Sequence, residues 1–322
     1  MPLLTPIIAG PTAGGKSALA VELALRVRAG ALAPHVTDAE IITADAFQIY
    51  RGLDIGTAKP TLAERRGVVH HLIDVVEPSE SFSVSQWLQA AEAAIAAVRG
   101  RGHVPIVVGG THLYVKALLD GLFEGPGASP ELRAELNALS PAALRAELER
   151  VDPKAAARLH PNDLRRSVRA LEVFRLTGRP ISELQTQWDN ERGPSPYLLV
   201  TLEWPVEAIN RRINERVRQM MAQGLEQEAR RLEAAGVLGP QAREALGYKQ
   251  LLHAFVSGST IEDAVEEIKI ETRRFAKNQR TWLKRLRAVP GMLNIEVECE
   301  QGAASDEWAA RIMQRLHPSG GQ

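Results

Sequence analysis

Short apolar runs alternate with longer amphipathic or alanine-rich segments over the first 120 residues of the chain. The apolar runs are continuous, which is typical of strands in a parallel sheet that is covered on both faces. The pattern predicts strands at LTPIIAG (4–10), EIITAD (40–45), HHLIDVV (70–76) and VPIVVGG (104–110), with helices at 16–29 and 84–99. Strands that alternate with helices in this way indicate an α/β fold on a parallel sheet.

The pattern changes after Gly121 to polar helical segments with no strand among them. Ser140-Pro141 and Pro161-Asn162 are helix-start signals within this stretch, since proline is favoured in the first helical turn. The run YLLVTLEW (197–204) restores a strand, long amphipathic helices follow, and MLNIEVE (292–298) predicts a last strand. We therefore expect an α/β core over 1–121 and 196–317, interrupted by a helical insertion domain over 122–195.

Net charge, cysteine content and the length of apolar runs limit the classes of protein to which the chain can belong. The chain has 322 residues and a formal net charge of zero, which argues against nucleic-acid binding over the whole surface but allows a local basic groove. Its one cysteine, Cys299, has no partner for an intramolecular disulfide. With no signal-peptide pattern and no apolar run of roughly 18 residues, the sequence predicts a cytoplasmic protein.

The stretch GPTAGGKS, residues 10–17, directly follows the first predicted strand and precedes a predicted helix. It fits G-x-x-x-x-G-K-[ST], in which backbone N–H groups cradle phosphates, the lysine neutralises them and the hydroxyl binds Mg²⁺. The expected phosphate-binding residues are Gly10, Pro11, Thr12, Ala13, Gly14, Gly15, Lys16 and Ser17, and Ser17 is the expected Mg²⁺ ligand.

A second polar segment, ADAFQIYRGLDIGTAKPT (44–61), follows the second strand. Asp45 lies at the carboxyl end of that strand, where ligands of open α/β sheets bind. Its carboxylate has three possible roles: binding Mg²⁺, accepting a proton from a nucleophile, or capping the next turn. Gln48 and Arg51 have donors and acceptors suited to a purine.

The third segment, VVGGTHLYVKALL (107–119), predicts a buried strand, two glycines and a helix, and places Thr111 at the same sheet edge. This strand does not end in the aspartate that holds Mg²⁺ in P-loop hydrolases. The sequence therefore disfavours an ATPase.

Positive charge is concentrated in two places. Residues 269–287 contain eight basic side chains and one acidic one, with Phe275 and Trp282 interleaved. The insertion adds Arg165, Arg166 and Arg169. Each cluster alone fits either ion pairs with acidic neighbours or a surface for phosphates, but two of them on a neutral chain favour a nucleic-acid groove. Arg212 and Arg216, one helical turn apart, suit either a diphosphate clamp or a solvent face.

Six motifs occur in one order: GPTAGGKS, DAFQIYRGLDIGTAKP, GGTHLYVKALL, HPNDLRRSVRALEV, ALGYKQL and RRFAKNQRTWLKR. Over roughly residues 5–287 the chain resembles the bacterial tRNA dimethylallyltransferases of the IPP transferase family. The resemblance implies a P-loop NTPase-like α/β core with a helical insertion. It also implies transfer of a dimethylallyl group from dimethylallyl diphosphate to N6 of adenine 37 in the tRNA anticodon loop, with release of diphosphate and with Mg²⁺ as cofactor. A monomer suits an asymmetric RNA substrate.

The resemblance also implies roles for particular residues. Asp45 matches the general base, and Arg216, with Arg212 as the alternate, matches the arginine that stabilises the leaving diphosphate beside Lys16 and Ser17. The positions that match tRNA contacts are Asp45, Ala46, Phe47, Gln48, Thr111, Arg133, Arg165, Arg166, Arg169, Lys249, Lys277, Arg280 and Lys284. Ala46 and Phe47 depart from the usual family residues, and Ala46 has no hydroxyl with which to contact RNA.

Three other functions fit parts of the pattern. A small-molecule kinase would use the loop for ATP, an adenylate isopentenyltransferase would modify free nucleotide, and an RNA-binding P-loop protein would use nucleotide only as a switch. The missing aspartate disfavours the kinase, and the two basic clusters favour tRNA over free nucleotide.

Overall fold

The computed structural model describes residues 3–30, 32, 36–123, 125–185, 195–286, 291–297 and 305–316. The chain divides into two compact units, one formed by Met1–Leu119 with Ser195–Gln322 and the other by Asp120–Pro194. The borders expected from the sequence are 121 and 195. Cys299 and Arg287 lie outside the described residues.

The first unit is built on a six-stranded sheet in the order β3-β2-β4-β1-β5-β6, with every pair parallel. The strands are β1 (Thr5–Ala9), β2 (Ala39–Ala44), β3 (His70–His71), β4 (Val104–Gly109), β5 (Tyr197–Glu203) and β6 (Leu293–Glu296). The predicted parallel α/β class is confirmed. Because the carboxyl ends of parallel strands share one edge, the segments that follow β1, β2 and β4 meet there.

The predicted strand at 70–76 is wrong after its second residue. β3 ends at His71, and Leu72 and Asp74 have φ values of 60° and 57°, in the left-handed region that interrupts a strand. Leu72, Ile73 and Val76 are buried and Val75 is exposed. None of them continues the ladder, since the N–H groups of Val75 and Val76 both donate to the Ile49 carbonyl.

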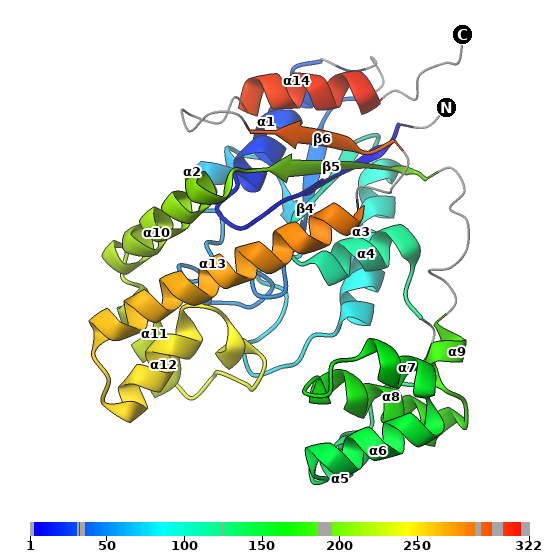
Figure 1. Ribbon diagram of the computed structural model, residues 1–322. Coiled ribbons are helices and arrows are strands. Elements are labelled where there is room, and N and C mark those ends of the chain that lie inside the picture. The colour runs from blue at the N-terminus through cyan, green and yellow to red at the C-terminus, as the bar shows by residue number, and fades with distance from the viewer. Residues whose placement is uncertain are drawn as a thin grey trace. The chain divides into compact units, whose positions relative to one another are not determined.

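Helices cover both faces of the sheet (Figure 1). Ile8 and Ile41 face α1 (Lys16–Arg28), α14 (Ser305–Leu316) and the start of α10 (Val206–Ala222). Ile7 and Ile42 face α3 (Val84–Gly100) and α4 (His112–Asp120), together with the end of α13 (Ile261–Leu286). The opposite directions of neighbouring strand residues explain why these runs are continuously apolar.

A second hydrophobic cluster of this unit lies under the segment that follows β2. Ile49, Tyr50 and Leu53 pack there with residues of α11 (Leu225–Ala234), α12 (Tyr248–Ser257) and the first half of α13. The short elements α2 (Leu62–Arg65) and η1 (Ala242–Glu244) complete the secondary structure of the unit. This packing fixes the segment 45–61 at the edge of the sheet.

The second unit is helical and has its own apolar core. It comprises α5 (Pro130–Asn137), α6 (Pro141–Val151), α7 (Pro153–Arg158), α8 (Leu164–Thr177) and α9 (Ile181–Leu184). Ser140 accepts the Ala143 N–H ahead of Pro141, and Asp163 caps α8 in the same manner. These caps satisfy N–H groups that a helix start leaves unpaired.

Among the described helices of both units, none combines the length and the apolar character that a membrane span needs.

Candidate active site

The phosphate loop connects β1 to α1 and is held by side chains from distant parts of the chain. Trp204, directly after β5, is buried and its indole N–H donates to the Gly14 carbonyl at 3.1 Å. Lys16 begins α1, and its Nζ donates to the Pro11 carbonyl at 2.8 Å. The loop is therefore fixed in shape while the lysine points back along it.

Arg212 and Arg216 lie one turn apart on α10 but make different contacts. Arg212 Nε donates to the Ala13 carbonyl at 2.8 Å, and its guanidinium lies 4.7 Å from the Trp204 ring centroid. Arg216 makes no hydrogen bond or ion pair with the residues that the structure describes. Its charge interacts with those of Lys16 and Asp45. Arg212 thus supports the loop, while the Arg216 guanidinium keeps its donors for a ligand.

Burial and the Arg216 charge lower the pKa of Lys16 from 10.5 to about 7, against a smaller opposing effect of Asp45. Burial likewise lowers the pKa of Arg216, although Asp45 and Glu64 favour its charged form. Two poorly solvated cations side by side are costly unless an anion joins them. The charges of this site are therefore arranged for a polyanion.

A cavity of about 1210 Å³ opens beside these cations. It is lined by residues 13–18 of the loop and α1, by Arg212 and Arg216, and by Ile55 and Lys59 of the segment after β2. Asp45 is not among the described residues that line it. The cavity has room for a diphosphate with a small organic group.

Asp45 follows β2 and is half-buried. Its Oδ1 accepts the Phe47 N–H at 2.9 Å and the Gln48 N–H at 3.2 Å, so the carboxylate caps the next turn. Its Oδ2 makes no hydrogen bond with any residue that the structure describes. One oxygen is therefore structural and the other is available, and the capping role does not exclude a chemical one.

Thr111 joins the Asp45 segment to the turn after β4. Its Oγ1 accepts the Ala46 N–H at 3.1 Å, and its own N–H donates to the Ala44 carbonyl at 3.2 Å. Gln48 is also tied down, because its Nε2 donates to the Thr57 and Ala58 carbonyls at 3.1 and 3.3 Å. Tyr50 is fully buried, and Arg51 pairs with Glu77 instead of facing the site.

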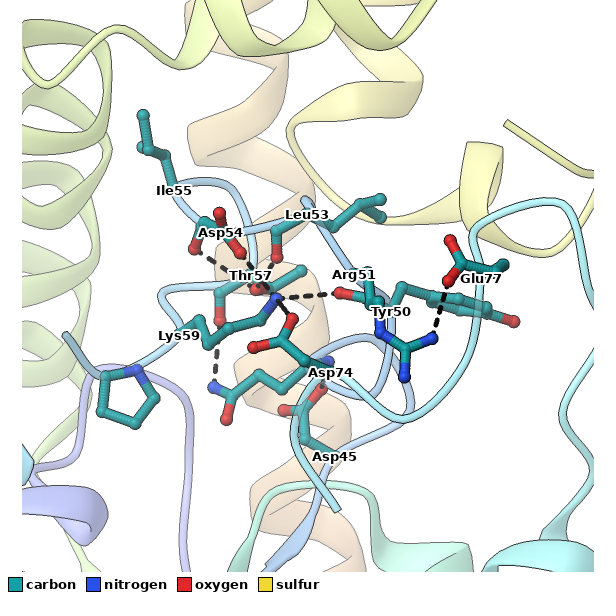
Figure 2. Close-up of polar contacts among 12 residues, drawn as sticks. Asp45, Tyr50, Arg51, Leu53, Asp54, Ile55, Thr57, Lys59, Asp74 and Glu77 are labelled. Carbon is teal, nitrogen blue, oxygen red and sulfur yellow. Dashed lines mark hydrogen bonds and ion pairs between the residues drawn. The ribbon is translucent and has the colours of Figure 1, made fainter. Parts of the chain in front are cut away.

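Lys59 is the centre of the segment after β2 (Figure 2). Its side chain is 4% exposed, and its Nζ contacts Asp54 Oδ1 at 2.6 Å, Asp74 Oδ1 at 2.5 Å and the Tyr50 carbonyl at 2.8 Å. The buried ammonium has a partner for each of its three protons. It therefore connects the middle of the segment with the chain after β3.

The same segment is bonded to α11 and α12. The buried Glu228 carboxylate accepts the N–H of Ile55 at 3.0 Å and the hydroxyl of Tyr248, and that hydroxyl also accepts the Gly56 N–H at 3.2 Å. A Cβ on Gly56 would lie 2.4 Å from Tyr248 Cε2, so only glycine fits. The motifs DIGT and ALGYK are thus packed against each other.

The basic helix α13 has two different faces. Lys277, Arg280 and Lys284, spaced three and four residues apart, share one face and make no ion pair with any described residue. Others in the helix are paired, as Lys269 is with Glu266 and Arg274 with Glu271. Lys249 of α12 pairs with the exposed Glu244.

In the second unit, Arg133 and Arg169 converge on one carboxylate. Glu172 is fully buried and accepts a two-pronged contact from Arg133, at 2.8 and 3.0 Å, and a third from Arg169 at 2.5 Å. These arginines are partly neutralised. Arg165 and Arg166 are exposed, and Arg166 has only a 3.6 Å contact to Asp163.

The model of the family described as IPP transferase matches residues 48–286. The chain belongs to the IPP transferase family.

A tRNA dimethylallyltransferase of Thermomicrobium roseum is 42% identical to this family member over 335 residues, covering 98% of this chain and 96% of the relative. That of Syntrophobacter fumaroxidans is 44% identical over 284 residues, covering 86% and 80%. The solved tRNA isopentenylpyrophosphate transferase of Bacillus halodurans matches with a TM-score of 0.68 at 36% identity, covering 97% and 96%. A eukaryotic dimethylallyltransferase acting on tRNA matches with a TM-score of 0.78 at 27% identity, covering 95% and 77%.

In this IPP transferase, the first unit brings together residues predicted from three separate motifs: the phosphate loop, Asp45 and Thr111, with Arg212 and Arg216 beside them. Sequence reasoning missed the groups that hold them, namely Trp204, Lys59, Glu228, Tyr248 and Gln279. Trp204, Lys59, Tyr248 and Gln279 lie in segments that the sequence singled out, but the spacing of residues along the chain does not reveal which of them are in contact in the fold.

Proposed function

We propose that this IPP transferase transfers the dimethylallyl group of dimethylallyl diphosphate to N6 of adenine 37 in tRNA and releases diphosphate. Its family membership gives the reaction class. The observation that carries the assignment is that two poorly solvated cations, Lys16 and Arg216, lie within electrostatic reach of the Asp45 carboxylate at the same edge of the sheet.

The cations suit the leaving group. As the carbon–oxygen bond breaks, its electron pair stays on diphosphate, whose growing charge needs fixed donors nearby. Lys16 and the loop amides supply some of them, and Arg216 supplies a guanidinium that makes no hydrogen bond or ion pair within the described chain. We assign Arg216 to the diphosphate and Arg212 to support of the loop.

Asp45 suits the nucleophile. The lone pair of an adenine amine is delocalised into the ring, so removal of its proton helps the attack. The nitrogen–carbon bond forms as the carbon–oxygen bond breaks, and the N6 proton passes to Asp45. Oδ1 keeps its two backbone hydrogen bonds, which aim Oδ2 as the acceptor.

Mg²⁺ fits the donors at this site. Among the described residues no three acidic or histidine side chains cluster to hold a metal, and Mg²⁺ is commonly held by one or two protein oxygens with substrate phosphates. Ser17, at the start of α1 and lining the cavity, would supply its hydroxyl. When bound, the ion would neutralise charge on the diphosphate.

The side chains that we assign to tRNA contact are exposed or partly exposed cations. Lys277, Arg280 and Lys284 present cations without an ion pair among the described residues on one face of α13. In the second unit Arg165 and Arg166 are exposed, and Arg166 has only its 3.6 Å contact to Asp163. Phosphate contacts of this kind provide affinity and salt dependence. Adenine 37 must leave its loop to reach Asp45, as in other enzymes that act on a base.

The experiment is incubation of the full chain with unmodified tRNA and dimethylallyl diphosphate, followed by mass analysis of anticodon-loop nucleosides. Wild type should add one dimethylallyl group, and Asp45→Asn should lower the transfer rate about 10²–10⁴-fold with tRNA affinity little changed. Glu92→Gln, which removes an exposed charge on α3, is the matched control. Transfer to free adenylate alone, or phosphorylation without prenyl transfer, would contradict the proposal.

A further inference from the structure

Gln279 is a buried amide within the basic stretch of α13. Gln279 is 2% exposed and lies on the buried side of the helix with Ala276, Leu283 and Leu286. The cations Lys277 and Arg280, two residues before Gln279 and one after it, lie on another, more exposed face of the helix. A polar side chain at this depth needs partners for both ends of its amide.

Both partners belong to the catalytic edge of the sheet. Oε1 of Gln279 accepts the backbone N–H of Thr12 at 2.7 Å, and Nε2 donates to the Gly110 carbonyl at 2.9 Å. The amide thus bridges the loop after β1 and the turn after β4. A Cβ on Gly110 would lie 2.6 Å from Nε2, so this contact requires glycine there.

The connection continues to the proposed base. Thr111 follows Gly110 directly and holds the Ala46 N–H through its hydroxyl. A chain of hydrogen bonds therefore runs from the phosphate loop through Gln279 and the Gly110–Thr111 turn to the segment that carries Asp45.

We propose that Gln279 is a positioning residue, which sets the phosphate loop, and with it the leaving diphosphate, relative to Asp45. This inference rests on the proposed function. In a displacement at carbon, the leaving oxygen, the carbon and the attacking nitrogen must be aligned, and a misplacement of about 1 Å can cost about 10²-fold in rate. α13 then has two roles: its outer cations bind RNA and its buried amide aligns the two halves of the site.

Gln279→Met tests this, because methionine has a similar length and removes both hydrogen bonds. With both substrates saturating, its single-turnover transfer rate should fall about 10–100-fold, with KM for tRNA and affinity for inorganic pyrophosphate within about threefold of wild type. Asn278→Ser replaces an exposed amide on the same helix with a residue of similar helix propensity. It controls for helix stability and should leave the affinity for pyrophosphate and the thermal midpoint unchanged.

Gln279→Glu gives a second test that does not depend on how well the methionine variant folds. Its carboxylate still accepts from Thr12, but it donates to Gly110 only when protonated. Its rate relative to wild type at the same pH should therefore recover as pH falls. A raised KM for tRNA with an unchanged saturated rate would make Gln279 an RNA contact and overturn the inference.

An unchanged saturated transfer rate in both Gln279 variants would also overturn the inference. A loss of transfer rate that the unfolded fraction of each variant fully accounts for would overturn it as well. If wild type itself fails to modify tRNA, the proposed function fails. If wild type is active and the variants match it, only the role of Gln279 fails.

Discussion

Lys16 titrates near neutral pH, and this gives the binding of diphosphate a defined pH dependence. Burial and the neighbouring Arg216 lower its pKa to about 7. A bound diphosphate compensates both effects, so it favours the protonated lysine and should return the pKa toward its ordinary value. Binding above pH 7 therefore takes up a proton.

The size of the effect follows from the pKa. At about 7, Lys16 in the free protein is roughly half protonated at pH 7 and roughly 1% protonated at pH 9. If the bound form stays protonated throughout, affinity should fall roughly 50-fold between these two pH values. Below pH 6 the lysine is already charged and its contribution should be constant.

The assay is calorimetric titration with inorganic pyrophosphate from pH 6 to 9, in buffers of different ionisation enthalpy so that proton uptake is counted. Lys16→Arg stays charged over this range, and dividing wild-type affinity by that of the variant at each pH removes the titration of the ligand itself. Arg216→Met should move the midpoint upward, since it removes the neighbouring cation.

Identical pH slopes in wild type and Lys16→Arg would refute the reasoning, provided that the variant is folded by thermal unfolding. A midpoint that does not respond to Arg216→Met would show that the Arg216 charge does not lower the pKa of Lys16.

Three other changes have defined outcomes. Lys284→Glu should weaken tRNA binding and reduce the slope of log affinity against log salt by about 1–2; an unchanged slope would remove α13 from the RNA surface. Gly56→Ala should lower the free energy of unfolding by about 1–3 kcal/mol through its clash with Tyr248, and Tyr248→Leu in the same chain should recover part of this in a denaturant double-mutant cycle. Glu172→Gln should destabilise the second unit by about 1–3 kcal/mol at neutral pH. The pKa of Glu172 is lowered despite burial by its arginine and backbone hydrogen bonds, so the wild-type advantage should persist above the ordinary carboxylate pKa and disappear in acid; an equal gap at low pH would contradict this.

The fold could be predicted wherever a sequence pattern is compatible with only one local structure. Continuous apolar runs between helices indicated the parallel sheet, and GPTAGGKS marked the turn from β1 to α1. The run at 70–76 failed because burial and strand pairing are different properties. Leu72 is buried, yet its positive φ takes the chain out of the sheet.

The chemical groups of the site were predictable, but their supports were not. Asp45 could be recognised because it follows a buried strand. Trp204 makes one hydrogen bond and Gln279 makes two, all to backbone groups that are distant in sequence, and no sequence pattern indicates such contacts. The residue spacing alone did not separate Arg212 from Arg216, and the choice of Arg216 for the diphosphate came from the family resemblance. In the structure they differ, because Arg212 contacts the Ala13 carbonyl and the Trp204 ring while Arg216 makes no hydrogen bond or ion pair with a described residue.

The hydrogen bond between Thr12 and Gln279 joins residues 267 positions apart. During synthesis the loop therefore leaves the ribosome long before its partner exists. A chain that stops within the second unit has the whole GPTAGGKS motif but lacks Trp204, Arg212, Arg216 and the helix that bridges the loop to the next turn. We expect such nascent or truncated chains to hold diphosphate poorly, so that the prenyl donor meets an organised site only on a nearly complete enzyme.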